Sequence, residues 1–114
     1  MPTPPSNRDN RPLRSDFASD PDMAELVVEF VGELTSRTAA METAFRDGQV
    51  ERLRVLAHQL RGAAGGYGFP AISAAAGKLE DQIRALPDPA AARAAELAGQ
   101  LDELIGLCRR ATAA

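Results

Sequence analysis

Apolar residues recur every three, four or seven positions through four stretches of this chain, and glycine or proline interrupts the pattern between them. This spacing places the apolar side chains on one face of a helix. Four amphipathic helices joined by short turns predict an all-α fold, an antiparallel up-down four-helix bundle. Composition agrees, because alanine is abundant while valine, isoleucine and aromatic residues, which favour strands, are sparse.

Capping residues and helix breakers set the limits of the first two predicted helices. Asp20 is a suitable N-cap, and Pro21 then occupies the first helical position. Gly48 ends this first helix. The second helix runs from about 49 to 67, and Gly68 is its stop.

Prolines delimit the remaining two helices. Pro70 opens the third helix, and the segment 86–89 breaks it. Asp88 is the predicted cap of the fourth helix, with Pro89 at its first position. The apolar stripe of the fourth helix consists of Leu97, Leu101, Leu104 and Cys108.

Residues 1–19 read as a flexible, disordered tail, which leaves residues 20–112 as one folded domain. The tail is rich in proline and polar residues and has little to bury. Its nearer end, Ser15–Ser19, could bring Phe17 against the bundle. A weak basic arm is the alternative interpretation, since the tail contains Arg8, Arg11 and Arg14.

Charge and composition exclude several classes of function. The net charge of −3 gives no overall positive field for nucleic acid. No apolar run approaches the ~20 residues that a membrane span needs, and the N-terminus lacks a secretory signal pattern, so the cytoplasm is the expected location. Cys108 is expected to be a buried, inert thiol. His58 is the single histidine and cannot supply a structural zinc site.

His58 lies on the polar side of the second predicted helix. At 100° per residue the apolar side chains of this helix form one continuous arc, and His58 falls opposite it. The imidazole is therefore expected to face solvent, either as a functional group or as an ordinary surface histidine. The arc consists of Leu53, Leu56, Ala57, Leu60, Ala63, Ala64 and Tyr67.

The residues that share the face of His58 are basic or lack a side chain. They are Arg54, Arg61, Gly62 and Gly65. A glycine inside a helix costs about 1 kcal/mol relative to alanine, and these two fill no gap in the core. Close approach of another protein to the imidazole would explain them, whereas fraying of the helix end is the alternative.

The same helix has a local charge of +2, from Arg52, Arg54 and Arg61 against Glu51. A basic surface around a nucleophile suits a phosphoryl group, which an arginine can hold through charge-assisted hydrogen bonds. Arg61 is the candidate for this role. A solvated charged face remains the simpler interpretation of Arg52 and Arg54.

Glu80 on the third helix is the candidate partner of His58. If the two helices are antiparallel and turn near Phe69, His58 eleven residues before it and Glu80 eleven after it lie at similar height. Glu80 could then accept the Nδ1 proton and leave Nε2 as the free nucleophilic nitrogen. The alternative is an ion pair in solvent with Arg84, four residues further on.

The stretch 57–69 resembles the signature of histidine-containing phosphotransfer (HPt) domains, the shuttle modules of multistep two-component signalling. The matching positions are His58, Arg61, Gly62 and Gly68 in this stretch, and the Leu79–Glu80 pair further along the chain. The resemblance covers about residues 20–110. Two positions depart from the commonest pattern, because family members usually have lysine where this chain has Arg61, and some have glutamine where it has Glu80.

The resemblance implies a phosphoryl carrier rather than an enzyme. His58 would take a phosphoryl group on Nε2 from a receiver-domain phospho-aspartate and relay it to another receiver aspartate. Arg61 would stabilise the phosphoryl group and Glu80 would orient the imidazole, while Arg54, Gly62 and Gly65 would dock the partner.

The expected partners are receiver domains of response regulators or hybrid histidine kinases, which would supply Mg²⁺. The chain itself is expected to be a monomer with no cofactor and no bound metal, nucleic acid or membrane. It contains no GxxxxGK[ST] phosphate loop, so neither ATP binding nor autokinase activity is expected.

Other functions are compatible with parts of this pattern. The chain could be a non-catalytic helical docking module for a kinase or receiver, with His58 incidental, or an HPt-like protein that docks without carrying phosphate. A hydrolase is disfavoured, because no Ser-His-Asp or Cys-His arrangement can be assembled around a histidine opposite the core.

Overall fold

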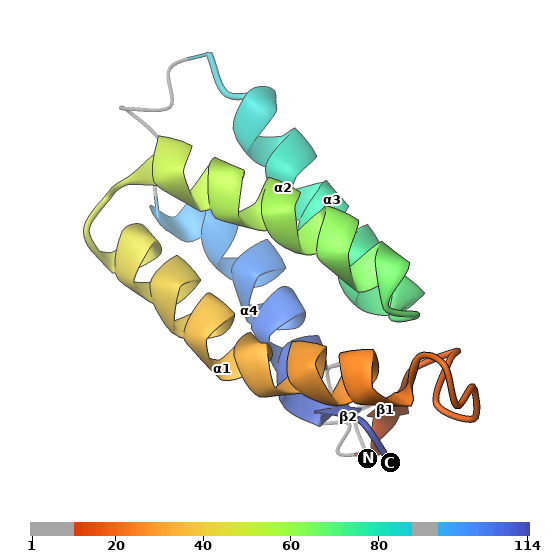
Figure 1. Ribbon diagram of the computed structural model, residues 1–114. Coiled ribbons are helices and arrows are strands. Elements are labelled where there is room, and N and C mark those ends of the chain that lie inside the picture. Colours follow the sequence, from red (N-terminus) through yellow and green to blue (C-terminus); the bar gives the residue numbers. More distant parts are fainter. Residues whose placement is uncertain (1–10, 88–93) are drawn as a thin grey trace, which may run out of the picture.

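The structure, a computed structural model, describes residues 11–87 and 94–114 and is mostly helical (Figure 1). The prediction of an all-α fold with four helices is confirmed within these ranges. The helices are α1 (Ala24–Arg46), α2 (Val50–Gly66), α3 (Pro70–Arg84) and α4 (Ala94–Arg110). Two short strands, β1 (Leu13–Arg14) and β2 (Ala111–Thr112), flank them in sequence. None of the described helices is long and apolar enough to cross a membrane.

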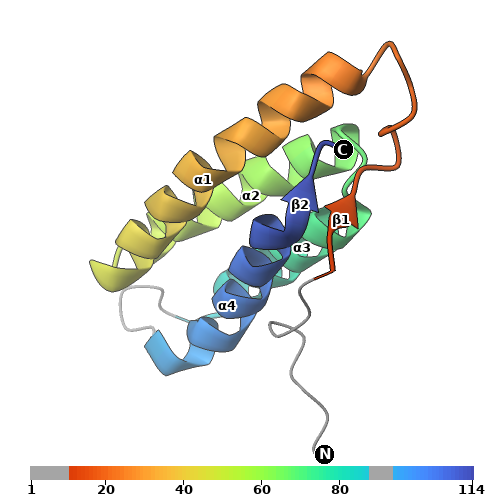
Figure 2. The same ribbon diagram turned by 90° about the horizontal axis from the view of Figure 1, so that it is seen from below.

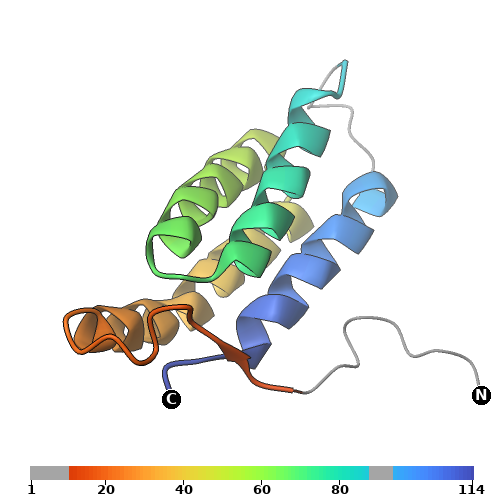
Figure 3. The ribbon, with the colours of Figure 1, turned by 90° about the vertical axis from the view of Figure 1, so that its right-hand side faces the viewer.

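The core lies where the apolar faces of the four helices meet. α2 packs against α1 and α3, and α4 packs against α3 and α1 (Figure 3). Phe30 of α1 stacks on Tyr67 at a ring-centroid distance of 5.1 Å and lies 5.7 Å from Phe69, which ties α1 to the end of α2. The predicted stripe of α4 is buried as expected, at Leu97, Leu101, Leu104 and Cys108.

The glycines predicted to end the first two helices do so. Gly48 has φ +70° and Gly68 has φ +84°, in the left-handed region that glycine adopts without a steric cost. Each reversal also satisfies a carbonyl at the helix end, because Gln49 N–H donates to Ala44 O at 2.8 Å and Phe69 N–H donates to Ala64 O at 2.9 Å. These two glycines therefore form the short turns that join α2 to α1 and to α3.

The start of α1 was predicted wrongly. The helix begins at Ala24, three residues after the predicted first position at Pro21. Asp20 still caps, but it caps a turn: its Oδ1 accepts the N–H of Asp22 at 2.9 Å and its carbonyl accepts that of Met23 at 3.0 Å. The N–H of Ala24 also donates to the Asp20 carbonyl at 3.0 Å, so residues 20–23 form a turn that leads directly into α1. The predicted cap of α4, Asp88 and Pro89, lies outside the described residues.

Residues 11–19 contact both the C-terminal segment and the α2–α3 turn. β1 pairs in parallel with β2, with Leu13 opposite Ala111 and Arg14 opposite Thr112, so the segment before α1 lies beside the segment that follows α4 (Figure 2). The Nε of Arg14 donates to Ala114 O at 3.0 Å. A two-residue ladder of this kind depends on partners from distant parts of the chain, which local composition does not reveal.

After β1, the N-terminal segment crosses the α2–α3 turn. Ser15 is buried, and its Oγ donates to Tyr67 O at 2.6 Å and accepts the N–H of Phe17 at 3.0 Å. Asp16 N–H donates to Gly68 O at 2.8 Å. Phe17 packs against the core, as the sequence analysis suggested. The segment is thus held by buried hydrogen bonds as well as by an aromatic side chain.

Cys108 is buried on α4, as expected. Burial raises the pKa of its thiol to about 12, because the thiolate would lose its hydration. The thiol therefore stays protonated and unreactive at neutral pH.

Candidate functional site

His58 lies on the exposed side of α2. Its side chain is 63% exposed, whereas Ala57 and Leu60 beside it are fully buried. The structure agrees with the orientation expected from the helical wheel. The buried arc is narrower than expected, since Leu56, Ala63 and Tyr67 are only partly buried.

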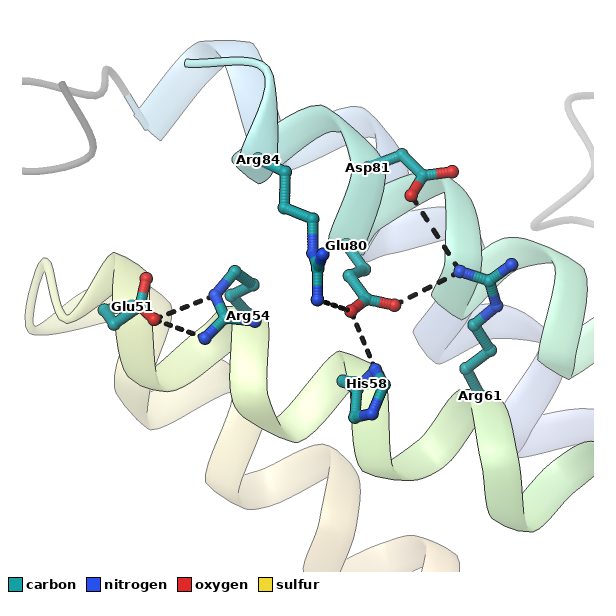
Figure 4. Close-up of polar contacts among 7 residues, drawn as sticks. All are labelled: Glu51, Arg54, His58, Arg61, Glu80, Asp81 and Arg84. Atoms are coloured by element: carbon teal, nitrogen blue, oxygen red, sulfur yellow. Dashed lines mark hydrogen bonds and ion pairs between the residues drawn. The ribbon is translucent and has the colours of Figure 1, made fainter. Parts of the chain in front are cut away.

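Glu80 of α3 meets His58 across the α2–α3 contact (Figure 4). Its Oε2 is 2.8 Å from His58 Nδ1, although the two residues are 22 positions apart in sequence. The same Oε2 is 2.9 Å from an Arg84 nitrogen, and Oε1 accepts from Arg61 NH1 at 3.2 Å. The two alternatives for Glu80, a contact with His58 and an ion pair with Arg84, therefore occur together. Glu80 is only 1% exposed, so this carboxylate is buried among three donors.

The contact with Glu80 fixes the proton of the neutral imidazole. An ionised carboxylate only accepts hydrogen bonds, so the nitrogen that faces it, Nδ1, carries the proton. Nε2 then holds the lone pair, and it points away from α3 (Figure 4). The site thus presents a nucleophilic nitrogen on an exposed helix surface.

Two opposing effects act on the carboxyl of Glu80. Burial disfavours its charged form and raises the pKa. Hydrogen bonds from His58 and Arg61, together with the positive charges of His58 and Arg84, lower the pKa by more, so the pKa of Glu80 lies below its usual range. The carboxylate is therefore ionised at neutral pH, which the tautomer of His58 requires.

Because the pKa of Glu80 is lowered in the folded state, part of the free energy of unfolding depends on pH. The folded form binds the Glu80 proton less readily than the unfolded chain, so its contribution is present above the ordinary glutamate pKa of about 4.3 and is lost as the pH falls through the lower folded value. We expect Glu80→Gln to cost about 1 kcal/mol at pH 7. The difference from the unmodified protein should shrink below about pH 4.3, as urea unfolding at pH 7, 5, 4 and 3 would measure. A difference that is independent of pH would contradict the ionised state of Glu80.

Arg61 lies along α3 rather than projecting freely into solvent. Its NH1 is 3.2 Å from Glu80 Oε1 and 3.8 Å from Asp81 Oδ1, and its side chain is 49% exposed. Gly77 makes room for it, because a Cβ there would lie 3.1 Å from Arg61 Nε. Ser73 Oγ donates to the backbone carbonyl of Arg61 at 2.8 Å.

The sequence analysis missed Gly77 as a residue that accommodates Arg61. The available signal was a buried glycine in the interior of a helix, where glycine costs about 1 kcal/mol relative to alanine and needs a reason. The side chain that needs the space comes from another helix, so the sequence alone does not identify it.

Arg54 is not part of the Glu80 cluster. Its Nε and NH2 both donate to Glu51 Oε1, the former at 2.8 Å, within the same helix (Figure 4). The hydrogen bond from Arg54 lowers the pKa of Glu51. Arg54 therefore lies one turn before His58 with its guanidinium directed toward the start of α2.

The two glycines on the His58 face differ in their surroundings. A Cβ at Gly62 would have no neighbouring atom within 4 Å, so this position leaves open surface one turn after His58. A Cβ at Gly65 would lie 3.4 Å from Ser73 Oγ, an ordinary van der Waals contact, so this position borders α3 without being crowded by it. A groove of about 350 Å³ begins here and is lined by Arg61, Gly65, Ser73, Gly77 and Lys78, among others.

The described residues contain no group of three His, Cys, Asp or Glu side chains that could hold a metal ion. The acidic side chains at the site are instead engaged by arginines, as with Glu80 and Asp81. The site as described is therefore a histidine with a buried carboxylate partner, bordered by cations and open surface.

Comparison with known proteins gives one family. Residues 25–110 match the family model of the Hpt domain, a range that includes all four helices almost entirely and every residue of the site. A search of curated proteins and a search of solved structures each gave no match. Hpt domains are phosphocarrier modules, not kinases, and they interact with receiver domains in multistep phosphorelays. Since the match extends over most of its length, this chain belongs to the Hpt domain family.

Proposed function

We propose that this protein accepts a phosphoryl group on Nε2 of His58 from the phospho-aspartate of one receiver domain and relays it to the aspartate of another. The observation that carries the proposal is the 2.8 Å contact between His58 Nδ1 and the buried Glu80 Oε2. This contact gives an exposed imidazole whose outward nitrogen has a free lone pair.

The transfer balances without any further reactant. The lone pair of Nε2 attacks the phosphorus, an N–P bond forms, and the P–O bond to the aspartate breaks, so the receiver carboxylate leaves as an anion. The ring then carries the Nδ1 proton and the phosphoryl group together and is positively charged. Glu80 stabilises that charge through the existing hydrogen bond. Transfer to the second receiver is the reverse of these steps.

Arg61 is proposed to stabilise the phosphoryl group. Its NH1 contacts Glu80, and the guanidinium has five N–H donors in all, so others are left for phosphoryl oxygens. Its position three residues after His58 on the same helix places both on one face. In-line phosphoryl transfer depends mainly on positioning and charge neutralisation, which an arginine supplies.

The receiver is proposed to dock on the exposed face of α2, on Arg54, Gly62 and Gly65. An antiparallel up-down arrangement of the bundle would keep this face outward along its whole length. The receiver would bring both the aspartate and Mg²⁺, while this chain would act as a monomer in the cytoplasm. In this proposal the chain neither binds ATP nor phosphorylates itself.

Gly62 provides a test of the docking surface. We expect Gly62→Leu to leave helicity nearly intact and to weaken receiver binding at least about tenfold, because a clash of about 1.4 kcal/mol or more suffices for that. Gly62→Ala is the matched control: it should stabilise the helix by about 1 kcal/mol and bind almost normally. Calorimetric titration with a receiver would measure both. Equal binding by the leucine variant and the unmodified protein would place Gly62 outside the interface.

The proposed function is tested by a phosphotransfer assay. The purified chain is mixed with phosphorylated receiver domains from its own genome, and any transferred label is tested for lability in acid and stability in alkali. Mass spectrometry of the labelled peptide should then locate the phosphoryl group on His58. If no receiver transfers label while circular dichroism shows a folded chain, the proposal fails, and a docking module with an incidental histidine becomes the better explanation.

A further inference from the structure

Glu80 is held at two points by arginines from different helices. On α2, Arg61 approaches Oε1 at 3.2 Å. On α3, Arg84 lies one turn after Glu80 and approaches Oε2 at 2.9 Å, the same oxygen that meets His58 Nδ1 at 2.8 Å (Figure 4). The oxygen that orients the imidazole is therefore shared between His58 and Arg84.

We propose that Arg84 is a positioning residue for the phosphoryl transfer: it holds Oε2 of Glu80 in the place where that atom meets Nδ1 of His58. This inference rests on the proposed function of His58. Arg84 itself contacts neither the phosphoryl group nor the reacting nitrogen, and it acts only through Glu80.

The two arginines have unequal consequences for the carboxylate. A carboxyl group turns about its side-chain bonds, so a donor on one oxygen alone leaves the other free to move. With Arg84 removed, Arg61 would be the one arginine of α2 and α3 left in contact with Glu80. It contacts Oε1 at 3.2 Å, a longer distance than the 2.9 Å between Arg84 and Oε2. The carboxylate would then shift toward Arg61, and its contact with Nδ1 would lengthen or break.

The burial of Glu80 makes this second contact important. An ion pair between exposed side chains four residues apart is weak. Here the side chain of Glu80 is only 2% exposed, while that of Arg84 is 56% exposed. The carboxylate therefore has little access to water as a substitute donor. The arginine thus holds a buried group from the surface, where its own removal leaves no cavity.

The state of the imidazole depends on this arrangement. A neutral histidine carries its proton on either ring nitrogen, and the hydrogen bond at one nitrogen decides which. If Oε2 leaves Nδ1, part of the protein population shifts the proton to Nε2 and loses the nucleophilic lone pair there. Arg84 should therefore affect the fraction of reactive tautomer and not the affinity for the receiver.

The experiment compares Arg84→Ala with Arg84→Lys and with Arg37→Ala. Arg37 pairs with Glu33 at the same four-residue spacing, at 3.4 Å on α1, and is the matched control. The ring ¹⁵N chemical shifts of His58 report which nitrogen is protonated, and single-turnover phosphorylation by a receiver reports the rate. A loss of about 1 kcal/mol in the positioning of the carboxylate corresponds to about fivefold in rate.

For Arg84→Ala we expect a smaller Nδ1–H fraction and phosphoryl acceptance slowed about fivefold at saturating receiver, with unchanged receiver affinity. Arg84→Lys should restore most of the rate, because it keeps a cation near Oε2. Arg37→Ala should match the unmodified protein. In a Glu80→Gln background, the further change Arg84→Ala should have almost no effect, because Arg84 acts through the carboxylate.

Unchanged ¹⁵N shifts in Arg84→Ala would overturn the inference, as would a loss confined to receiver affinity, which would make Arg84 a docking residue. An equal effect of Arg84→Ala in the Glu80→Gln background would also overturn it. Failure of the proposed function is a separate result: the unmodified chain would then accept no phosphoryl group, while the ¹⁵N shifts would still report whether Arg84 controls the tautomer.

Discussion

Replacing His58 with glutamine should remove phosphoryl acceptance and leave the bundle folded. Glutamine has no nucleophilic nitrogen, so the loss should be at least about 10³-fold, as when an enzyme loses its nucleophile. The fold should persist because the imidazole is 63% exposed and contributes no surface to the core. Glu80 would keep its contacts with Arg61 and Arg84, and the glutamine amide can donate a hydrogen bond to the Glu80 carboxylate. The free energy of unfolding should therefore change by less than about 1 kcal/mol.

Two measurements decide this prediction. Transfer of label from a phosphorylated receiver gives the loss of function, and thermal unfolding followed by circular dichroism gives the stability. Gln59→Ala, at the exposed neighbouring position on α2, is the matched control and should accept phosphate normally. Acceptance by His58→Gln at the rate of the unmodified protein would show that another residue carries the phosphoryl group.

The helices and the orientation of His58 could be predicted from the sequence because both depend on local information. Gly48 and Gly68 end helices through their own backbone freedom. The spacing of Leu53, Ala57 and Leu60 defines a buried face that leaves His58 outside it. Even the contact between His58 and Glu80 followed from one assumption, that two helices reverse at the Gly68–Phe69 turn.

The parts that could not be predicted depend on contacts between distant segments. The contact of Arg61 with Gly77 needs the relative rotation of α2 and α3, which helical periodicity does not fix closely enough. The sharing of Glu80 between His58 and Arg84 needs atomic positions, because either partner alone satisfies the sequence pattern. The pairing of β1 depends on a strand partner about 100 positions away, which the composition of the N-terminal segment does not reveal.

The N-terminal segment makes Gly68 the second position with a large expected effect, here on stability. Gly68 has φ +84°, which costs other residues about 1–2 kcal/mol. A Cβ at this position would also lie 2.5 Å from Ser15 Oγ, 2.9 Å from Phe17 Cδ2 and 3.0 Å from the backbone nitrogen of Asp16. Because one of these neighbours is backbone, the segment cannot relax by a side-chain rotation alone. The crowding adds about 1–3 kcal/mol, so Gly68→Ala should lose about 3 kcal/mol in total.

Gly48→Ala separates the two causes of this loss. Gly48 has nearly the same backbone conformation, φ +70°, but a Cβ there would meet no atom within 4 Å, so its substitution should cost only about 1–2 kcal/mol. Urea unfolding of both variants measures the difference, and hydrogen exchange at the Asp16 and Phe17 amides should rise only in Gly68→Ala. Equal losses of unfolding free energy in the two variants would mean that the N-terminal segment makes no close steric contact with the α2–α3 turn. A larger loss in Gly68→Ala would instead show that residues 15–17 are part of the folded domain. They would then support the α2–α3 turn, which positions Glu80 of α3 beside His58 of α2.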